Sequence, residues 1–132
     1  MTSIVTYQKG LRTTCTHVKS GSAFITVAPP DNHGKGEAFS PTDLTATSLA
    51  TCMLTVMGIY AERNNISLDG AKAEVTKFMA NDPRRIVKAK VELFMPAGIP
   101  QTERKQLEDI AINCPVAKSL HPEIEQEVIF HY

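Results

Sequence analysis

Apolar residues dominate one stretch near the middle of the chain, Leu44 to Ala61, which runs for 18 residues without a charged side chain. The run is too long for an ordinary strand and is typical of a helix that is buried on nearly all of its sides. We therefore predict a helix over residues 41–64, with Cys52 near its middle.

The residues that flank this run support the same helix. Ser40 is a favourable N-cap, Pro41 suits the first helical position, and Asp43 suits the third. At the other end, Asn64 and Asn65 have side-chain amides that favour a turn. The prediction is a helix of about six turns.

Short strand patterns precede the helix. Three segments near 3–8, 11–18 and 22–28 are separated by turn residues and predict a meander over residues 1–28. Residues 29–39, "PPDNHGKGEAF", form a loop rich in proline and glycine. A loop of this length is often functional, and this one leads directly into the predicted helix.

The second half of the chain predicts strands and an amphipathic helix. Apolar and polar residues alternate in "AKAEV" and "VKAKVEL", which indicates a strand pair over 71–95. Helical spacing of Leu107, Ile110, Ala111 and Cys114 indicates helices over 101–120. The closing segment predicts a strand over 124–132.

Length and charge restrict the class of protein. A chain of 132 residues is a normal size for a single domain, here 1–132. Fourteen basic and fourteen acidic residues give a net charge of zero, which argues against nucleic acid or an anionic membrane as a partner. Three widely spaced cysteines do not make a secreted disulfide framework, so we expect a cytoplasmic protein.

The uncharged run also has the minimum length of a transmembrane helix. Five of its residues are threonine or serine, however, and it lacks flanking basic and aromatic residues, so we expect a core helix and no membrane span. One chain of this size cannot easily cover such a helix on every face. We therefore expect a second copy to cover part of it in a homodimer.

Cys114 lies at a break between helices, because Pro115 suits the first position of a new helical turn. A thiol at a helix N-terminus tends to have a lowered pKa and more thiolate, which would make Cys114 reactive. The alternative is that Cys114 is a small packing residue on the apolar stripe of its helix.

Two interpretations are open for Cys52 as well. Its own helical face carries Thr45, Ser48 and Thr55 among apolar residues, and these hydroxyls can bond to helix carbonyls without any function. Cys52 is then either an inert core residue or a thiolate that needs a cation. Cys15 is expected to be a packing residue or a spectator.

The histidines do not suggest a metal site. His17, His33, His121 and His131 show no close-spaced ligand pair with each other or with a cysteine. His17 and the basic turn Pro83–Arg85 are expected to be solvated surface.

Two cysteine motifs together resemble one family. "FSPTDLTATSLATCMLTVM" and, some sixty residues later, "INCPVAKSLHPEIEQEV" are similar to the motifs of the OsmC/Ohr family, which comprises osmotically inducible protein C and the organic hydroperoxide resistance proteins. The resemblance implies an α+β fold in which antiparallel sheets pack around two central cysteine-bearing helices. It also implies an intertwined homodimer with active sites at the subunit interface.

The resemblance further implies a chemistry for the cysteines. Cys52 would attack an organic hydroperoxide and become a sulfenic acid, and Cys114 would resolve it as a disulfide. A dithiol or a lipoylated protein would reduce that disulfide, and no cofactor is implied.

Peroxidases of this family also use an arginine that stabilises the thiolate and a glutamate that orients the arginine. Arg12 is the arginine candidate, although an exposed strand residue is an equal alternative. The family's N-P-E pattern is replaced by "SPT", which leaves Thr42 in place of the carboxylate. Glu37 is the candidate substitute, because Asp43 lies about 180 degrees from Cys52 on an ideal helix and is better explained as a cap.

Two functional hypotheses result. The first is a thiol-dependent peroxidase for organic hydroperoxides. The second is an OsmC-like dimeric thiol protein, or a binder of small hydrophobic ligands, without efficient peroxidase turnover. Activation of Cys52 separates the two.

Overall fold

The computed structural model describes residues 1–132, which form two compact units, Met1–Thr45 and Ala46–Tyr132. The boundary falls inside the long helix α1, which spans Pro41–Arg63.

The first unit is built on a three-stranded antiparallel sheet. Its strands are β1 (Ser3–Gln8), β2 (Arg12–His17) and β3 (Ala23–Val27), in the order β1-β2-β3. The three segments that the sequence predicts as a meander are thus the three strands of this sheet.

The loop between β3 and α1 folds back on the end of β3. It contains a short 3-10 helix, η1 (Pro30–Asn32), and the Gly34 N–H donates to the carbonyl of Pro29. A Cβ atom at Gly34 would lie 1.7 Å from the carbonyl oxygen of Ala28, so only glycine permits this close approach. The loop is therefore an ordered part of the first unit.

Helix α1 begins with the predicted capping box. The Asp43 N–H donates to Ser40 Oγ at 3.0 Å, and the Ser40 N–H donates to Asp43 Oδ2 at 2.9 Å. Both donors would otherwise lack a partner within the helix. The predicted roles of Ser40 and Asp43 are confirmed.

One face of α1 is buried within the chain, rather than nearly all of its sides. The buried residues follow helical spacing and are Ala46, Leu49, Ala50, Met53, Met57 and Ala61. On other faces Thr51, Thr55 and Ile59 are exposed. By length and composition α1 could cross a membrane, with a mean hydropathy of 1.5 over an 18-residue window, but the core helix of a soluble protein meets the same criterion.

The second unit contains the other sheet, whose strands are β4 (Lys72–Ala80), β5 (Arg85–Phe94) and β6 (Glu125–His131). Strands β4 and β5 form an antiparallel hairpin, whereas β5 and β6 are parallel. The expectation of purely antiparallel sheets is therefore wrong for this sheet. The chain returns from β5 to β6 through helices, a crossover that makes neighbouring strands parallel.

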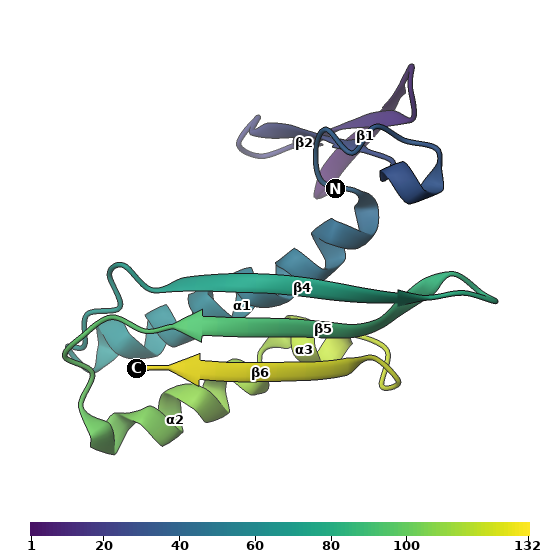
Figure 1. Cartoon of the computed structure of the whole chain (residues 1–132). Helices are drawn as coiled ribbons and strands as arrows, with labels where there is room; N and C mark the ends of the chain where they lie inside the picture. The colour runs from purple at the N-terminus through teal and green to yellow at the C-terminus, as the bar shows by residue number, and fades with distance from the viewer. The chain divides into compact units, whose positions relative to one another are not determined.

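That crossover consists of α2 (Gln101–Ile112) and α3 (Pro115–Ser119). Both helices lie on the same side of the second sheet as α1 (Figure 1). The core between them contains side chains from α1, β5 and α2 together with one cysteine, and its most enclosed members are Leu49, Met53, Met57, Val91, Leu93, Leu107 and Cys114. The architecture is α+β, with two sheets and helices.

We predict that Ser40→Ala lowers the free energy of unfolding by about 1 kcal/mol or slightly more, because the Asp43 N–H loses its acceptor at a buried helix start. Urea unfolding at a fixed protein concentration measures the change.

Thr102→Ala is the control for Ser40→Ala, since Thr102 is an exposed residue of α2. Its effect should stay within about 0.5 kcal/mol. Equal effects of the two substitutions would contradict the role of the cap.

Candidate functional site: a pair of interacting cysteines

Two cysteines distant in sequence come together in the second unit. Cys52 is half-buried on α1, and Cys114 is the N-cap of α3 with only 1% of its surface exposed. Both are free thiols, and their side chains interact. Cys52 packs against the core cluster that contains Cys114, and neighbouring thiols can be oxidised to a disulfide.

The environment of Cys114 does not favour its thiolate. Burial raises the pKa of the Cys114 thiol above its ordinary value, and the neighbouring Cys52 raises it further. Backbone N–H groups of Ala117 and Val116 oppose this rise without cancelling it. The expected N-cap position is confirmed, but the expected lowered pKa is wrong, because desolvation outweighs the N–H groups.

Helix α3 holds Cys114 through its backbone. Pro115 occupies the first turn, as predicted, and the Ala117 N–H donates to Cys114 Sγ at 3.5 Å. The carbonyl of Ala117 accepts a bond from Gln126 Nε2 of β6 at 3.0 Å. No sequence motif marks Gln126, although it is a polar residue that alternates with the apolar positions Val128 and Phe130 of that strand.

The hydroxyl groups on the face of Cys52 are partly accounted for by the helix itself. Thr45 Oγ1 donates to the carbonyl of Pro41 at 3.1 Å, and Thr55 Oγ1 donates to that of Thr51 at 2.7 Å. Bonds of this kind are the non-functional alternative that the sequence allows. The bonds to helix carbonyls therefore explain these two hydroxyls without a catalytic role.

The other two candidate site residues form an ion pair in the first unit. Arg12, on β2, donates through Nη2 to Glu37 Oε2 in the loop before α1. The side chains are 28% and 53% exposed, so solvent weakens the attraction. Thr42 Oγ1 contacts Ser40 Oγ at 3.2 Å, and Asp43 caps α1. The carboxylate beside Arg12 is therefore that of Glu37.

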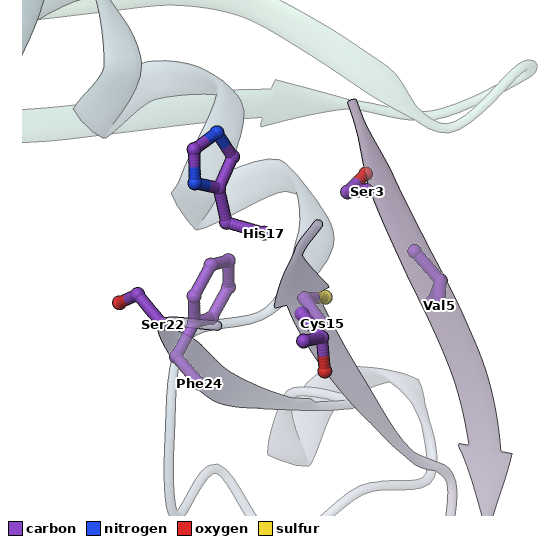
Figure 2. A pocket seen from close by; sticks show the side chains of 7 residues that line it. Ser3, Val5, Cys15, His17, Ser22 and Phe24 are labelled. Carbon is purple, nitrogen blue, oxygen red and sulfur yellow. The ribbon is translucent and has the colours of Figure 1, made fainter. Parts of the chain in front are cut away.

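A separate pocket of about 280 Å³ lies on the first sheet (Figure 2). Its lining includes Cys15, which is half-buried and 3.8 Å from Thr13 Oγ1, and His17, whose Nδ1 lies 2.7 Å from Ser20 Oγ. Phe24 forms part of the apolar wall. Cys15 and Cys52 thus belong to different units.

Among residues 1–132 no group of three or more histidine, cysteine, aspartate or glutamate side chains is arranged to hold a metal ion. The chemistry that the second unit offers is that of its thiol pair. Its fold and this pair define a class of α+β proteins in which one cysteine lies on a long helix and the other at the start of a short one.

The family model described as "OsmC-like protein" matches residues 34–128, and the chain belongs to this family. A Psychrobacter arcticus 273-4 protein described as an osmotic stress induced and detoxification response protein is 52% identical to it. Its structure superposes with a TM-score of 0.96 and covers 99% of this chain and 96% of that chain.

More distant structures share the fold. The organic hydroperoxide resistance protein OsmC of Legionella pneumophila is 18% identical, with a TM-score of 0.74 and coverage of 100% of this chain and 98% of that chain. The organic hydroperoxide resistance protein OhrB of Bacillus subtilis is also 18% identical, with a TM-score of 0.72 and coverage of 99% and 98%. A search of the curated proteins finds no match. These two proteins, which are named for resistance to organic hydroperoxides, therefore share the fold of this chain.

Proposed function

We propose that this protein is a cysteine-dependent peroxidase that reduces organic hydroperoxides. The observation that carries the proposal is that Cys52 packs against the core cluster that contains Cys114 in the second unit, where it also acts on the pKa of Cys114. Distant structural relatives are named for resistance to organic hydroperoxides, which supports the choice of substrate class.

The difference in exposure between the two cysteines supports a division of roles. Cys52 is partly exposed, so a peroxide can reach its sulfur, whereas Cys114 is enclosed. A raised pKa also makes Cys114 a poor first nucleophile near neutral pH, because the thiolate is the attacking form. Cys52 is accordingly the peroxidatic thiol, and Cys114 is the resolving thiol.

The proposed reaction has two steps in the protein. The Cys52 thiolate attacks the hydroxyl oxygen of the hydroperoxide, and the S–O bond forms as the O–O bond breaks. The alkoxide that leaves takes up a proton from solvent and becomes the alcohol. The Cys114 thiolate then attacks the sulfenic sulfur, the S–S bond forms, and hydroxide leaves and takes up a proton to become water. A dithiol or lipoylated protein of the cytoplasm restores the thiols by disulfide exchange.

We assign Arg12 the role of the cation that stabilises the Cys52 thiolate, with Glu37 orienting its guanidinium. The support is the ion pair between these two side chains. A guanidinium held by a carboxylate keeps a defined direction, although the carboxylate also offsets part of its charge. Glu37 would then do the work of the carboxylate that Thr42 replaces.

The functional unit in this proposal is a homodimer. Helix α1 is apolar but is buried on one face within the chain, and its residue Ile59 is 47% exposed. Large apolar residues are also exposed on the first sheet, among them Val5, Tyr7 and Phe24. A second copy would cover apolar surface that a lone chain leaves in water.

Oxidation of the reduced protein with one equivalent of cumene hydroperoxide tests the function. We expect fast formation of a Cys52–Cys114 disulfide, no reaction of this kind in Cys52→Ser, and a trapped sulfenic acid at Cys52 in Cys114→Ser. Free-thiol assays and disulfide mapping by mass spectrometry follow the products. Cys15→Ser is the control and should react like the wild type. Oxidation no faster than that of an ordinary free thiol would contradict the proposal and favour a thiol protein without turnover.

The ion pair has its own kinetic test. Arg12→Gln should slow the oxidation of Cys52 by about tenfold, because it removes the charge that stabilises the thiolate, and Glu37→Gln should slow it less. Stopped-flow measurements with excess peroxide give the rates. Arg85→Gln is the matched control, since Arg85 bonds to carbonyls of the β4–β5 turn. Wild-type rates in Arg12→Gln would remove Arg12 from the mechanism.

Light scattering coupled to gel filtration tests the dimer. The wild type should have twice the mass of one chain, and Ile59→Asp should shift it toward the monomer, because a carboxylate would be buried at the interface. Ile112→Asp is the matched control, since this α2 residue is 45% exposed. A monomeric wild type, or dissociation by both variants alike, would contradict the interface on α1.

A further inference from the structure

Helix α3 is too short to be stable by itself. It has five residues, Pro115–Ser119, whereas an isolated helix needs about 12–15 residues to be even marginally stable in water. Contacts from elsewhere must hold it in place. The position of α3 also affects Cys114, because this residue immediately precedes the helix as its N-cap.

One such contact comes from the side chain of Gln126. Strand β6 places Gln126 opposite Ala89 of β5, on the face of the sheet where Val128 and Phe130 pack against the core. A polar side chain on an apolar face needs a hydrogen-bond partner. Gln126 Nε2 finds it in the carbonyl oxygen of Ala117, at 3.0 Å.

The carbonyl oxygen of Ala117 lies near the end of α3, where a bond from another element can hold the helix in place. The carbonyl groups in the last turn of a helix have no partner within the helix, and α3 ends two residues after Ala117. Gln126 therefore ties the end of α3 to the sheet. The N–H group of the same residue, Ala117, donates to Cys114 Sγ at 3.5 Å.

We propose that Gln126 is a positioning residue for the resolving thiol: it holds Ala117 so that the N–H group of this residue stays directed at the sulfur of Cys114. This role rests on the proposed peroxidase function, in which Cys114 must ionise to attack the sulfenic acid of Cys52. Gln126 touches neither sulfur and acts through the backbone of α3.

The consequence concerns the second step of the reaction only. An N–H group directed at sulfur stabilises the thiolate and opposes the rise in the pKa of Cys114 that burial causes. If Ala117 moves, less thiolate forms at neutral pH and the disulfide forms more slowly. Oxidation of Cys52 by peroxide keeps its rate, because the bonds of Gln126 and Ala117 in this arrangement go to α3 and to Cys114.

The test compares Gln126→Met, which keeps the length of the side chain and removes the donor, with Gln106→Met on the exposed side of α2. Both are made in Cys15→Ser protein, so that two thiols remain. Rapid mixing with one equivalent of cumene hydroperoxide and acid quenching then give both rates by mass spectrometry at each pH. Gln126→Asn, which keeps the amide but is one methylene shorter, is the second variant should the first not fold.

We expect Gln126→Met to slow disulfide formation about three- to tenfold near neutral pH and to move its pH midpoint upward, with the rates converging at high pH. The rate of Cys52 oxidation should be unchanged, and Gln106→Met should match its parent. Slower disulfide formation with an unmoved midpoint would mean that Gln126 only supports the fold and would overturn the proposal, as would wild-type behaviour.

A titration separates this inference from the peroxidase function. In Cys15→Ser/Cys52→Ser protein the thiolate absorbance reports Cys114 alone, and its midpoint should rise when Gln126→Met is added. That shift would support the positioning role whether or not a disulfide forms in the wild type. Absence of the disulfide in the wild type would contradict the peroxidase function alone. An unshifted midpoint would overturn the positioning role whatever the peroxide does.

Discussion

The second unit depends on the packing of one face of α1 against the sheet of β4, β5 and β6. Leu49, Met53 and Met57 lie on this face and are fully enclosed. Burial of each such side chain contributes about 1.5–3 kcal/mol, so the rotational position of the helix is strongly determined. Cys52 precedes Met53 and therefore lies beside the buried face, half-buried within reach of Cys114. A rotation of α1 by one residue would both separate the two thiols and remove Leu49, Met53 and Met57 from the core.

The same enclosure gives the two sulfurs different properties. Cys114 is part of the core, and its burial disfavours the thiolate more than the N–H groups of α3 favour it. Cys52 lies on a more open side of its helix. A pair in which one thiol is accessible and the other is kept protonated favours attack by the first and delays the second until a partner is oxidised. The Ala117 N–H that points at Cys114 opposes this effect of burial without cancelling it.

The first unit places a carboxylate beside Arg12 although position 42 holds a threonine. The position that holds a carboxylate in the family's N-P-E pattern is Thr42, whose hydroxyl contacts that of Ser40. A carboxylate nevertheless lies beside Arg12, and it comes from Glu37 in the loop before α1. The loop that carries Glu37 packs closely on Ala28, where Gly34 has no room for a Cβ atom and the Gly36 N–H donates to the carbonyl.

The sequence by itself determined the elements of this protein. Periodicity and capping residues located the strands, the long helix and the N-cap at Cys114, because these signals are local, and two spaced motifs indicated the family. Only the tertiary structure decided that β6 runs parallel to β5, that burial raises the pKa of Cys114, and that Gln126 supports α3. Strand direction, desolvation and side-chain reach all depend on which distant residues become neighbours, and no local pattern encodes that.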